Sequence, residues 1–249
     1  MKALIFAAGI GSRLKPFTLH HPKALAEVGG KPLLQHVVER LRDEGGIREM
    51  VVNVHHFPEQ IRAFLEANGN FGVDIRISDE SDLLLDTGGG LLRAWTLLNP
   101  APDEPILLHN ADILTDFPIA EFTESHCRSG RDVTLLTQRR QSSRMLWLDS
   151  DGTLCGWQNM KTGECRPAGF SPAPPAMKAR AFGGVHIVNP SVLPQLQAYA
   201  DVHGEVFSTI PFYLDTLDKL HTGGFEDAEP YRWFDIGSEE KLRAARAGW

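Results

Sequence analysis

The chain has 249 residues, 42% of them hydrophobic, and its 25 Lys and Arg against 32 Asp and Glu give a formal net charge of −7 at pH 7. This length can bury a large core, and α/β chains of this size often form one domain, so we expect a single domain over residues 1–249. The acidic balance argues against nonspecific binding of nucleic acid, and no run reaches the roughly 18 apolar residues of a membrane span.

The first predicted element is a short buried strand at residues 3–8, which breaks abruptly into Gly9 and Gly11. Glycine lets the backbone turn sharply, so that consecutive amide groups can converge on an anion. Arg13 and Lys23 add positive charge beside this turn. The stretch therefore suits a polyphosphate, and the alternative is an ordinary connection from strand to loop.

Two strand–helix–strand units follow in the next 80 residues. The spacing predicts a helix after Lys31-Pro32 that ends at Gly45-Gly46, a strand at 49–54, a helix from Pro58 and a strand at 73–78. Such alternation predicts a parallel sheet with right-handed crossovers.

A second glycine-rich segment, Asp86-Thr87-Gly88-Gly89-Gly90, leads into a helical pattern. Glycines that open a helix are a second place where backbone amides can reach a ligand. The alternative is a flexible turn between strand and helix.

An apolar strand at 105–109 ends in Asn110-Ala111-Asp112. Open α/β sheets bind their ligands beyond the carboxyl ends of the strands, so a carboxylate here is well placed for chemistry. Asp112 is therefore a candidate metal ligand, and the alternative is an Asp that caps a helix beginning near 116–118.

Short strands at 132–137, 145–148 and 153–157 predict a small antiparallel β excursion, with a proline-rich surface loop or flap at 166–175. We place this β excursion at about 138–180. A strand at 181–188 resumes the sheet, and its Gly183-Gly184 pair either admits a sugar ring or forms a β-bulge.

The last third predicts helices at 191–199 and 207–220, then a strand that enters a helix capped by Ser238. Asp235, in Trp233-Phe234-Asp235-Ile236-Gly237, is a second metal-ligand candidate. Taken alone, an Asp before a turn glycine is more often structural.

The ten histidines and three cysteines do not predict a transition-metal site. His20-His21 and His55-His56 are adjacent pairs, whose side chains point to opposite faces of a strand. Cys127, Cys155 and Cys165 are an odd number without CxxC spacing, so we expect reduced thiols and a cytoplasmic chain. Residues 4–8 are also too short for a signal-peptide core.

The stretch Ala7-Ala8-Gly9-Ile10-Gly11-Ser12-Arg13-Leu14-Lys15-Pro16-Phe17-Thr18, with Pro22-Lys23, resembles the signature of the sugar-1-phosphate nucleotidyltransferases. The Thr-Gly-Gly segment and the Trp-Phe-Asp-Ile-Gly-Ser segment are similar to further motifs of this family. Asn110-Ala111-Asp112 matches its Asn-Gly-Asp pattern apart from Ala111.

The resemblance implies a three-layer, Rossmann-like α/β fold with a mostly parallel mixed sheet, and transfer of a nucleoside monophosphate from a nucleoside triphosphate to a sugar 1-phosphate. It implies Mg²⁺ as cofactor, held by Asp112 and Asp235, and catalytic roles for Arg13, Lys23 and Asp112. Nucleotide contacts are implied for Ala8, Gly9, Gly11, Ser12, Arg13, Lys23, Thr87, Gly88 and Gly89, and sugar-phosphate contacts for Asn110 and Gly183.

Other classes fit less well. A dinucleotide fingerprint needs a third glycine where this chain has Leu14, and an acidic residue after the second strand, which here ends in Asn53-Val54-His55. A non-catalytic module that binds a sugar nucleotide remains the alternative of another class. The presence of Arg13, Lys23, Asp112 and Asp235 together favours catalysis.

The short chain is most similar to the N-acetylmuramate 1-phosphate uridylyltransferases of bacterial cell-wall recycling. Guanylyltransferases that act on mannose or heptose 1-phosphate are the close alternative, because the β excursion is longer than the first subgroup leads us to expect. No hexapeptide-repeat tail is present, so we expect a monomer or weak homodimer.

Overall fold

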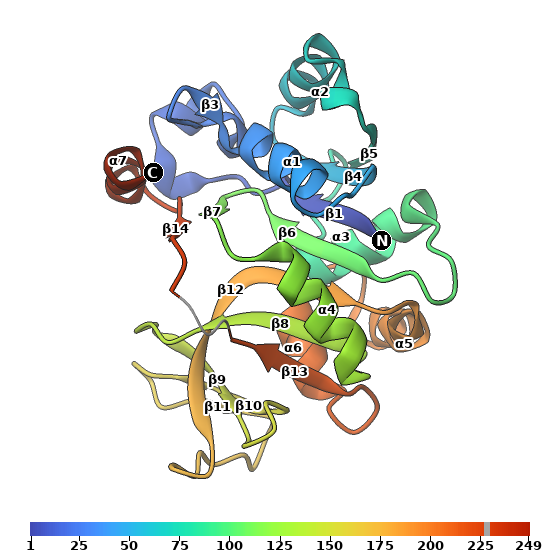
Figure 1. Ribbon diagram of the computed structural model, residues 1–249, viewed down its shortest axis with the longest axis vertical. Helices are drawn as coiled ribbons and strands as arrows, with labels where there is room; N and C mark the ends of the chain where they lie inside the picture. Colours follow the sequence, from blue (N-terminus) through green and yellow to red (C-terminus); the bar gives the residue numbers. More distant parts are fainter. Residues whose placement is uncertain (227–229) are drawn as a thin grey trace.

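A computed structural model describes residues 1–226 and 230–249 of the chain. Its centre is a ten-stranded sheet in the order β11-β10-β9-β12-β6-β1-β4-β5, with β8 beside β12 and β13 beside β8 (Figure 1). Two-stranded ladders β2-β3 and β14-β7 complete the strands.

The N-terminal half of the sheet is parallel. Its strands are β1 (Lys2–Phe6), β4 (Glu49–Val54), β5 (Asp74–Asp79) and β6 (Ile106–Asn110), with β1 between β4 and β6. Ala3, Leu4 and Ile5 are completely buried, because helices cover both faces of this strand. The carboxyl ends of these strands therefore share one edge of the sheet, where their loops can meet.

Helices form a layer on each face. One core packs beneath α1 (Leu33–Asp43), α2 (Pro58–Ala67) and α4 (Ile119–Ser129). The opposite core packs beneath α3 (Asp86–Leu98), α5 (Leu193–His203) and α6 (Thr209–Asp215). The predicted three-layer α/β class with a mixed sheet is thus confirmed. No helix in the described ranges is long and apolar enough to cross a membrane.

Strand β12 (Lys178–Val188) joins the parallel strands to the antiparallel ones. It pairs antiparallel with β6, with β8 (Val133–Gln138) and with β9 (Arg144–Leu148). Beyond β9 lie β10 (Leu154–Asn159) and β11 (Cys165–Arg166), both in antiparallel register (Figure 1). The register of β12 against β8 shifts between Phe182 and His186, so the Gly183-Gly184 pair sits in a β-bulge.

The region after α5 differs from the sequence-based expectation. The helix expected over 207–220 is limited to α6, and β13 (Thr222–Phe225) then pairs in parallel with β8. A Cβ on Gly223 would lie 2.4 Å from the Arg131 Nε atom. The sequence analysis predicted no strand here, and the missing side chain of Gly223 lets β13 pass close to Arg131.

The C-terminal segment returns to the N-terminal region. Strand β14 (Trp233–Asp235) pairs antiparallel with β7 (Ile113–Thr115), and α7 (Glu239–Gly248) follows. The Ser238 hydroxyl accepts a hydrogen bond from the Lys241 amide, which confirms the predicted cap. A small core joins α7 to the hairpin of β2 (Glu27–Val28) and β3 (Lys31–Pro32), near the 3-10 turns Ser12–Leu14, Phe17–Leu19 and Lys23–Leu25.

Candidate active site

The loop after β1 has one glycine that no other residue could replace without strain. Gly11 has a φ of 65°, and a Cβ there would lie 2.9 Å from Thr18 Cγ2. The Thr18 hydroxyl donates to the Gly11 carbonyl at 2.9 Å. The loop thus folds back over Thr18, which brings Lys23 beside Gly11.

A buried polar pair supports the start of this loop. The Asn53 side-chain oxygen accepts hydrogen bonds from the amides of Ala7 and Ala8, at 2.7 and 3.3 Å. Its amide nitrogen donates to Glu80 Oε1 at 2.8 Å, and Glu80 Oε2 accepts from the Leu85 amide at 3.1 Å. Glu80 is fully buried, and burial raises the pKa of its carboxyl while Asn53 and Leu85 oppose the rise. Asn53 and Glu80 therefore join three loops at the carboxyl edge of the sheet.

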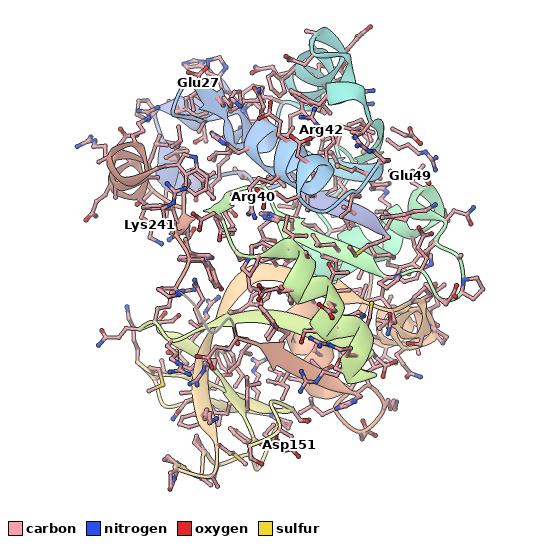
Figure 2. The ribbon with its side chains drawn as sticks, viewed as in Figure 1. Glu27, Arg40, Arg42, Glu49, Asp151 and Lys241 are labelled. Atoms are coloured by element: carbon pink, nitrogen blue, oxygen red, sulfur yellow. The ribbon has the colours of Figure 1, made fainter. Side chains whose placement is uncertain are left out.

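Asp235 is the last residue of β14, and Asp112 lies in the turn directly before β7, the partner strand of β14. Asp235 pairs with Ile113 in the register of β14 and β7, and the Ile236 amide donates to the Asp112 carbonyl at 2.9 Å. The Asp112 carboxylate is ion-paired with Lys23, and the Asp235 carboxylate is ion-paired with Lys241, which Figure 2 labels on α7. Two segments more than 120 residues apart thus place the backbones of these two aspartates side by side.

Further cations face the same place. A Cβ on Gly237 would lie 3.0 Å from Asp235 Oδ1 and 3.1 Å from Arg13 Nη2, so both side chains flank that glycine. Arg140 stacks on the Trp233 ring at 3.9 Å. Burial lowers the pKa of the Arg140 guanidinium, and the Asp235 charge acts in the opposite direction. This end of the site therefore combines cations that can bind anions with a carboxylate that balances part of their charge.

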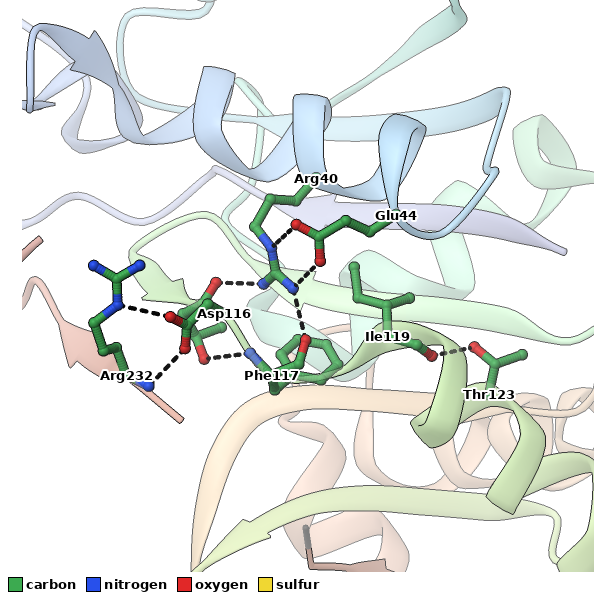
Figure 3. A network of polar contacts seen from close by, with 8 residues as sticks. Arg40, Glu44, Asp116, Phe117, Ile119, Thr123 and Arg232 are labelled. Atoms are coloured by element: carbon green, nitrogen blue, oxygen red, sulfur yellow. Dashed lines mark hydrogen bonds and ion pairs between the residues drawn. The ribbon is translucent and has the colours of Figure 1, made fainter. Parts of the chain in front are cut away.

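A network of polar contacts holds the ladder of β7 and β14 against α1 (Figure 3). Arg40 donates to the Thr115 carbonyl and to the Phe117 carbonyl, the latter at 2.6 Å, and it also pairs with Glu44. Asp116 accepts from the Arg232 amide and from Arg232 Nε, both at 2.6 Å. The network fixes the backbone at the end of β7 and in the residues that follow it.

The residues after β1, β4, β5 and β6 enclose a pocket of about 370 Å³, which we call the loop pocket. It is lined by Phe6, Ala7, Ala8, Gly9, Gly11, Lys23, Ala24, Asn53, Glu80, Leu84, Asp86, Thr87, Asn110, Ala111, Asp112 and Val206. Seven of the predicted site residues line it: Ala8, Gly9, Gly11, Lys23, Thr87, Asn110 and Asp112.

The other predicted site residues lie outside the lining of this pocket. Ser12 and Arg13 form the 3-10 turn behind the loop, and Asp235 lies on β14 beside Asp112. Gly183 lies in the β-bulge of β12, where its carbonyl accepts a hydrogen bond from Trp233 Nε1 at 2.8 Å.

Gly88 and Gly89 have a different task from the expected one. Their amides donate to the Phe207 carbonyl, at 2.8 and 3.2 Å, so they are used within the protein. A Cβ on Gly89 would lie 2.0 Å from the Glu205 carbonyl oxygen. These glycines let the segment before α6 pack against the start of α3. The side chain of Thr87, by contrast, stays in the pocket lining and accepts from the Thr209 amide at 3.0 Å.

A second pocket, of about 530 Å³, adjoins the first and shares Asp86, Thr87 and Asn110 with it. We call it the sheet pocket, because its wall comes from β9, β10 and β11. Its lining adds Arg144, Leu146, Trp157, Asn159, Glu164, Arg166, Phe182, His186, Ser208, Thr209, Ile210, Pro211 and Leu214. None of these was a sequence-based candidate, since single residues on short antiparallel strands carry no motif.

The carboxylates of the site satisfy only a limited set of metal requirements. In the described part of the chain, no three His, Cys, Asp or Glu side chains cluster so that they could hold a metal ion. Mg²⁺ commonly uses only one or two carboxylates and completes its shell with water and substrate phosphate. Asp112 and Asp235, each now balanced by a lysine ammonium group, fit that limited requirement.

Two buried histidines at the inner end of the site predict acid sensitivity. Burial lowers the pKa of His109 to about 4 and that of His186 to about 3, from an ordinary 6.5. Both stay neutral in the folded chain, whereas the unfolded chain takes up protons below pH 6.5. The stabilisation is therefore complete above pH 6.5 and is lost as pH falls toward 4, by about 1 kcal/mol per pH unit for each histidine.

Urea unfolding between pH 5 and 6.5 measures this slope. The variant His186→Gln should reduce the slope by about one proton. An unchanged slope in His186→Gln would contradict the assignment of a neutral, buried imidazole.

A glycine-rich turn, two aspartates and several cations thus lie at the carboxyl edge of the three-layer α/β sheet, which is where open α/β sheets bind their ligands. Residues 2–145 match the nucleotidyl transferase family, and the chain belongs to that family. This confirms the resemblance on which the sequence analysis rested.

Similar proteins were found by sequence and by structure. The chain is 30% identical over 241 residues to the mannose-1-phosphate guanylyltransferase catalytic subunit beta of Drosophila melanogaster, covering 95% of this chain and 59% of that protein. It is 32% identical over 240 residues to a mannose-1-phosphate guanyltransferase of Yarrowia lipolytica, covering 95% of this chain and 61% of the relative. The chain thus spans about 60% of the length of these curated relatives.

Among solved structures, a putative glucose-1-phosphate thymidylyltransferase from Bacillus anthracis superposes with a TM-score of 0.78 at 19% identity. That match covers 99% of this chain and 94% of the other. It supports the fold, because an identity this low carries no further information on substrates.

Proposed function

We propose that the protein transfers a nucleoside monophosphate from a nucleoside triphosphate to a sugar 1-phosphate and releases pyrophosphate. The observation that carries this proposal is the loop pocket, which brings Lys23 and Asp112 together with the glycine-rich loop and adjoins a second pocket. Two substrates can then lie side by side, the nucleotide in the loop pocket and the sugar in the sheet pocket, because the two pockets share Asp86, Thr87 and Asn110.

The reaction needs positioning and charge neutralisation more than acid–base chemistry. An oxygen of the sugar phosphate, already ionised at neutral pH, attacks the α-phosphorus. A new phosphorus–oxygen bond forms, the bond to the β-phosphate oxygen breaks, and pyrophosphate leaves with the electron pair. Lys23 would steady the attacking or α-phosphate, and Arg13 would brace the β- and γ-phosphates. Asp112 and Asp235 would hold Mg²⁺, which supplies positive charge to the phosphate oxygens when bound.

For the substrate pair we propose UTP with N-acetylmuramate 1-phosphate, on the basis of the motif resemblance. Transfer from GTP to mannose or heptose 1-phosphate is the second candidate, supported by the names of the guanylyltransferase relatives. Backbone groups and small residues line much of the loop pocket, and these can serve several bases.

A pyrophosphate-release panel tests the proposal. Five nucleoside triphosphates (ATP, CTP, GTP, UTP and dTTP) are crossed with the 1-phosphates of N-acetylmuramate, N-acetylglucosamine, mannose, heptose and glucose, and the sugar-nucleotide product is identified by mass spectrometry. Release should require both substrates. Pyrophosphate release from GTP with mannose or heptose 1-phosphate, and no release from UTP, would select the second candidate. Binding of nucleotide without release in any combination would instead indicate a non-catalytic module.

A further inference from the structure

The wall of the sheet pocket is one face of the antiparallel strands β9 and β10, on which the side chains that line the pocket lie in register. Arg144 and Leu146 of β9 both line the pocket, as expected for residues two apart on a strand. In the register of β9 and β10, Arg144 lies opposite Asn159 and Leu146 lies opposite Trp157. An apolar platform of Leu146 and Trp157 therefore has a polar row beside it, which suits the mixed surface of a sugar ring.

The floor of this pocket contains a polar side chain that has no partner. His186 is 1% exposed and lines the pocket, and within residues 1–226 and 230–249 neither of its ring nitrogens has a hydrogen-bond partner. Its ring instead packs against Phe182 and Tyr213. Buried polar atoms in native proteins are normally satisfied, so an unpartnered imidazole indicates a polar ligand in this pocket.

The charges of the pocket identify the kind of ligand. Glu164 is paired with Arg166 at 3.0 Å, and Asp86 accepts hydrogen bonds from the Thr87 amide and the Ser208 hydroxyl. The Arg144 guanidinium has no hydrogen bond or ion pair with any residue that the structure describes. One planar cation without a partner among the described residues is thus left in the pocket lining.

We propose that Arg144 is a specificity residue that binds an anionic substituent on the acceptor sugar, apart from its 1-phosphate. The proposal rests on the proposed transfer to a sugar 1-phosphate and adds the substrate class, an acidic sugar phosphate. Arginine binds carboxylates and phosphates through paired N–H donors, and such charge-assisted contacts are among the strongest hydrogen bonds. The ring of the sugar would lie on Trp157 and Leu146, with a hydroxyl group near His186.

Matched acceptors test the proposal. N-acetylmuramate 1-phosphate differs from N-acetylglucosamine 1-phosphate only in its carboxylate-bearing ether, and glucose 1,6-bisphosphate differs from glucose 1-phosphate only in its second phosphate. The unmodified protein should favour one anionic acceptor over its neutral counterpart by about 10- to 100-fold in kcat/KM. The pair that shows the preference tells whether the anion is a carboxylate or a phosphate.

The variants Arg144→Gln and Arg144→Lys carry the decisive comparison. In Arg144→Gln the ratio of kcat/KM for the anionic acceptor to kcat/KM for its neutral counterpart should fall toward one, mainly through a higher KM for the anionic acceptor. Arg144→Lys should keep part of this preference. Arg128→Gln, an exposed site on α4 that loses the same charge, should keep the full preference and so controls for general electrostatic attraction. A preference that survives in Arg144→Gln, or no preference in the unmodified protein, would overturn the proposal.

Failure of the proposed function is distinguishable from failure of this inference. If no acceptor supports pyrophosphate release, transfer itself fails, and calorimetric binding of the same acceptor pairs to the unmodified and Arg144→Gln proteins decides on the anion subsite. Tighter binding of the anionic member that depends on Arg144 would support the subsite, and equal binding would reject it.

Discussion

Replacing Asp112 by asparagine should lower kcat by about two to four orders of magnitude. The change keeps the shape of the side chain and removes a carboxylate that lines the loop pocket directly before β7. It also leaves Lys23 without its ion-pair partner, so both the balance of charge and the position of that ammonium group change. Initial rates of pyrophosphate release at saturating Mg²⁺ and substrates measure the effect.

Asp74→Asn is the matched control, because it removes an exposed carboxylate that pairs with Arg76 on the edge strand β5. It should keep kcat within about a factor of two, since exposed pairs contribute little. Circular dichroism should show that both variants unfold at nearly the same temperature as the unmodified chain. Near-normal turnover of Asp112→Asn at saturating Mg²⁺ would refute the metal-ligand role.

The sheet could be predicted closely where burial alone decides the pattern. The expected strand at 49–54 is β4, and the strand expected at 73–78 is β5 shifted by one residue. β4 is buried along nearly its whole length, whereas β5 alternates polar and apolar residues, and both patterns are visible in the sequence. The strand β13 was missed because its Gly223-Gly224 pair looks like a turn, and only the distant pairing with β8 makes it a strand.

The site could be predicted only where a motif repeats a known pattern. The glycine-rich loop, Lys23 and Asp112 have such patterns, and the structure brings them into one pocket. Asn53 entered the sequence analysis only as evidence against an oxidoreductase. Its role depends on the register that places β4 beside β1, which a single sequence does not reveal.

The same limit applies to the sheet pocket. Its wall residues come from three strands of the β excursion, and each is an ordinary surface residue until the register of β9, β10 and β11 places them on one face. His186 lies in a strand that the sequence analysis expected, but an isolated histidine in an apolar run is more often a core residue. Only its missing partner distinguishes it.

Asn53→Ala should lower the free energy of unfolding by about 2–5 kcal/mol, the largest stability change that we expect at the site. The side chain has three buried partners, the amides of Ala7 and Ala8 and the Glu80 carboxylate, and alanine satisfies none of them. Urea unfolding at pH 7 measures the loss. The loop that begins at Ala7 should also loosen, so the KM for the nucleoside triphosphate should rise.

The pH dependence and a double variant assign the loss to these contacts. Asn53 holds down the pKa of Glu80, which burial raises, so the variant should have a still higher folded-state pKa. A carboxyl group with a raised folded-state pKa stabilises the fold below the unfolded value of 4.5 and loses that contribution as pH rises. The loss of unfolding free energy in Asn53→Ala should therefore be larger at pH 7 than at pH 5.

The double variant Asn53→Ala with Glu80→Gln removes the buried carboxylate as well. Its loss of unfolding free energy should be at least 1 kcal/mol smaller than the sum of the two single losses, a coupling within the ~0.5–3 kcal/mol range of contacting residues. Asn68→Ala, at the exposed end of α2, should change stability by no more than about 0.5 kcal/mol. Additive losses in the double variant would show that Asn53 and Glu80 do not act as a pair, and the support of the loop would then have to come from the Asn53 contacts with Ala7 and Ala8 alone.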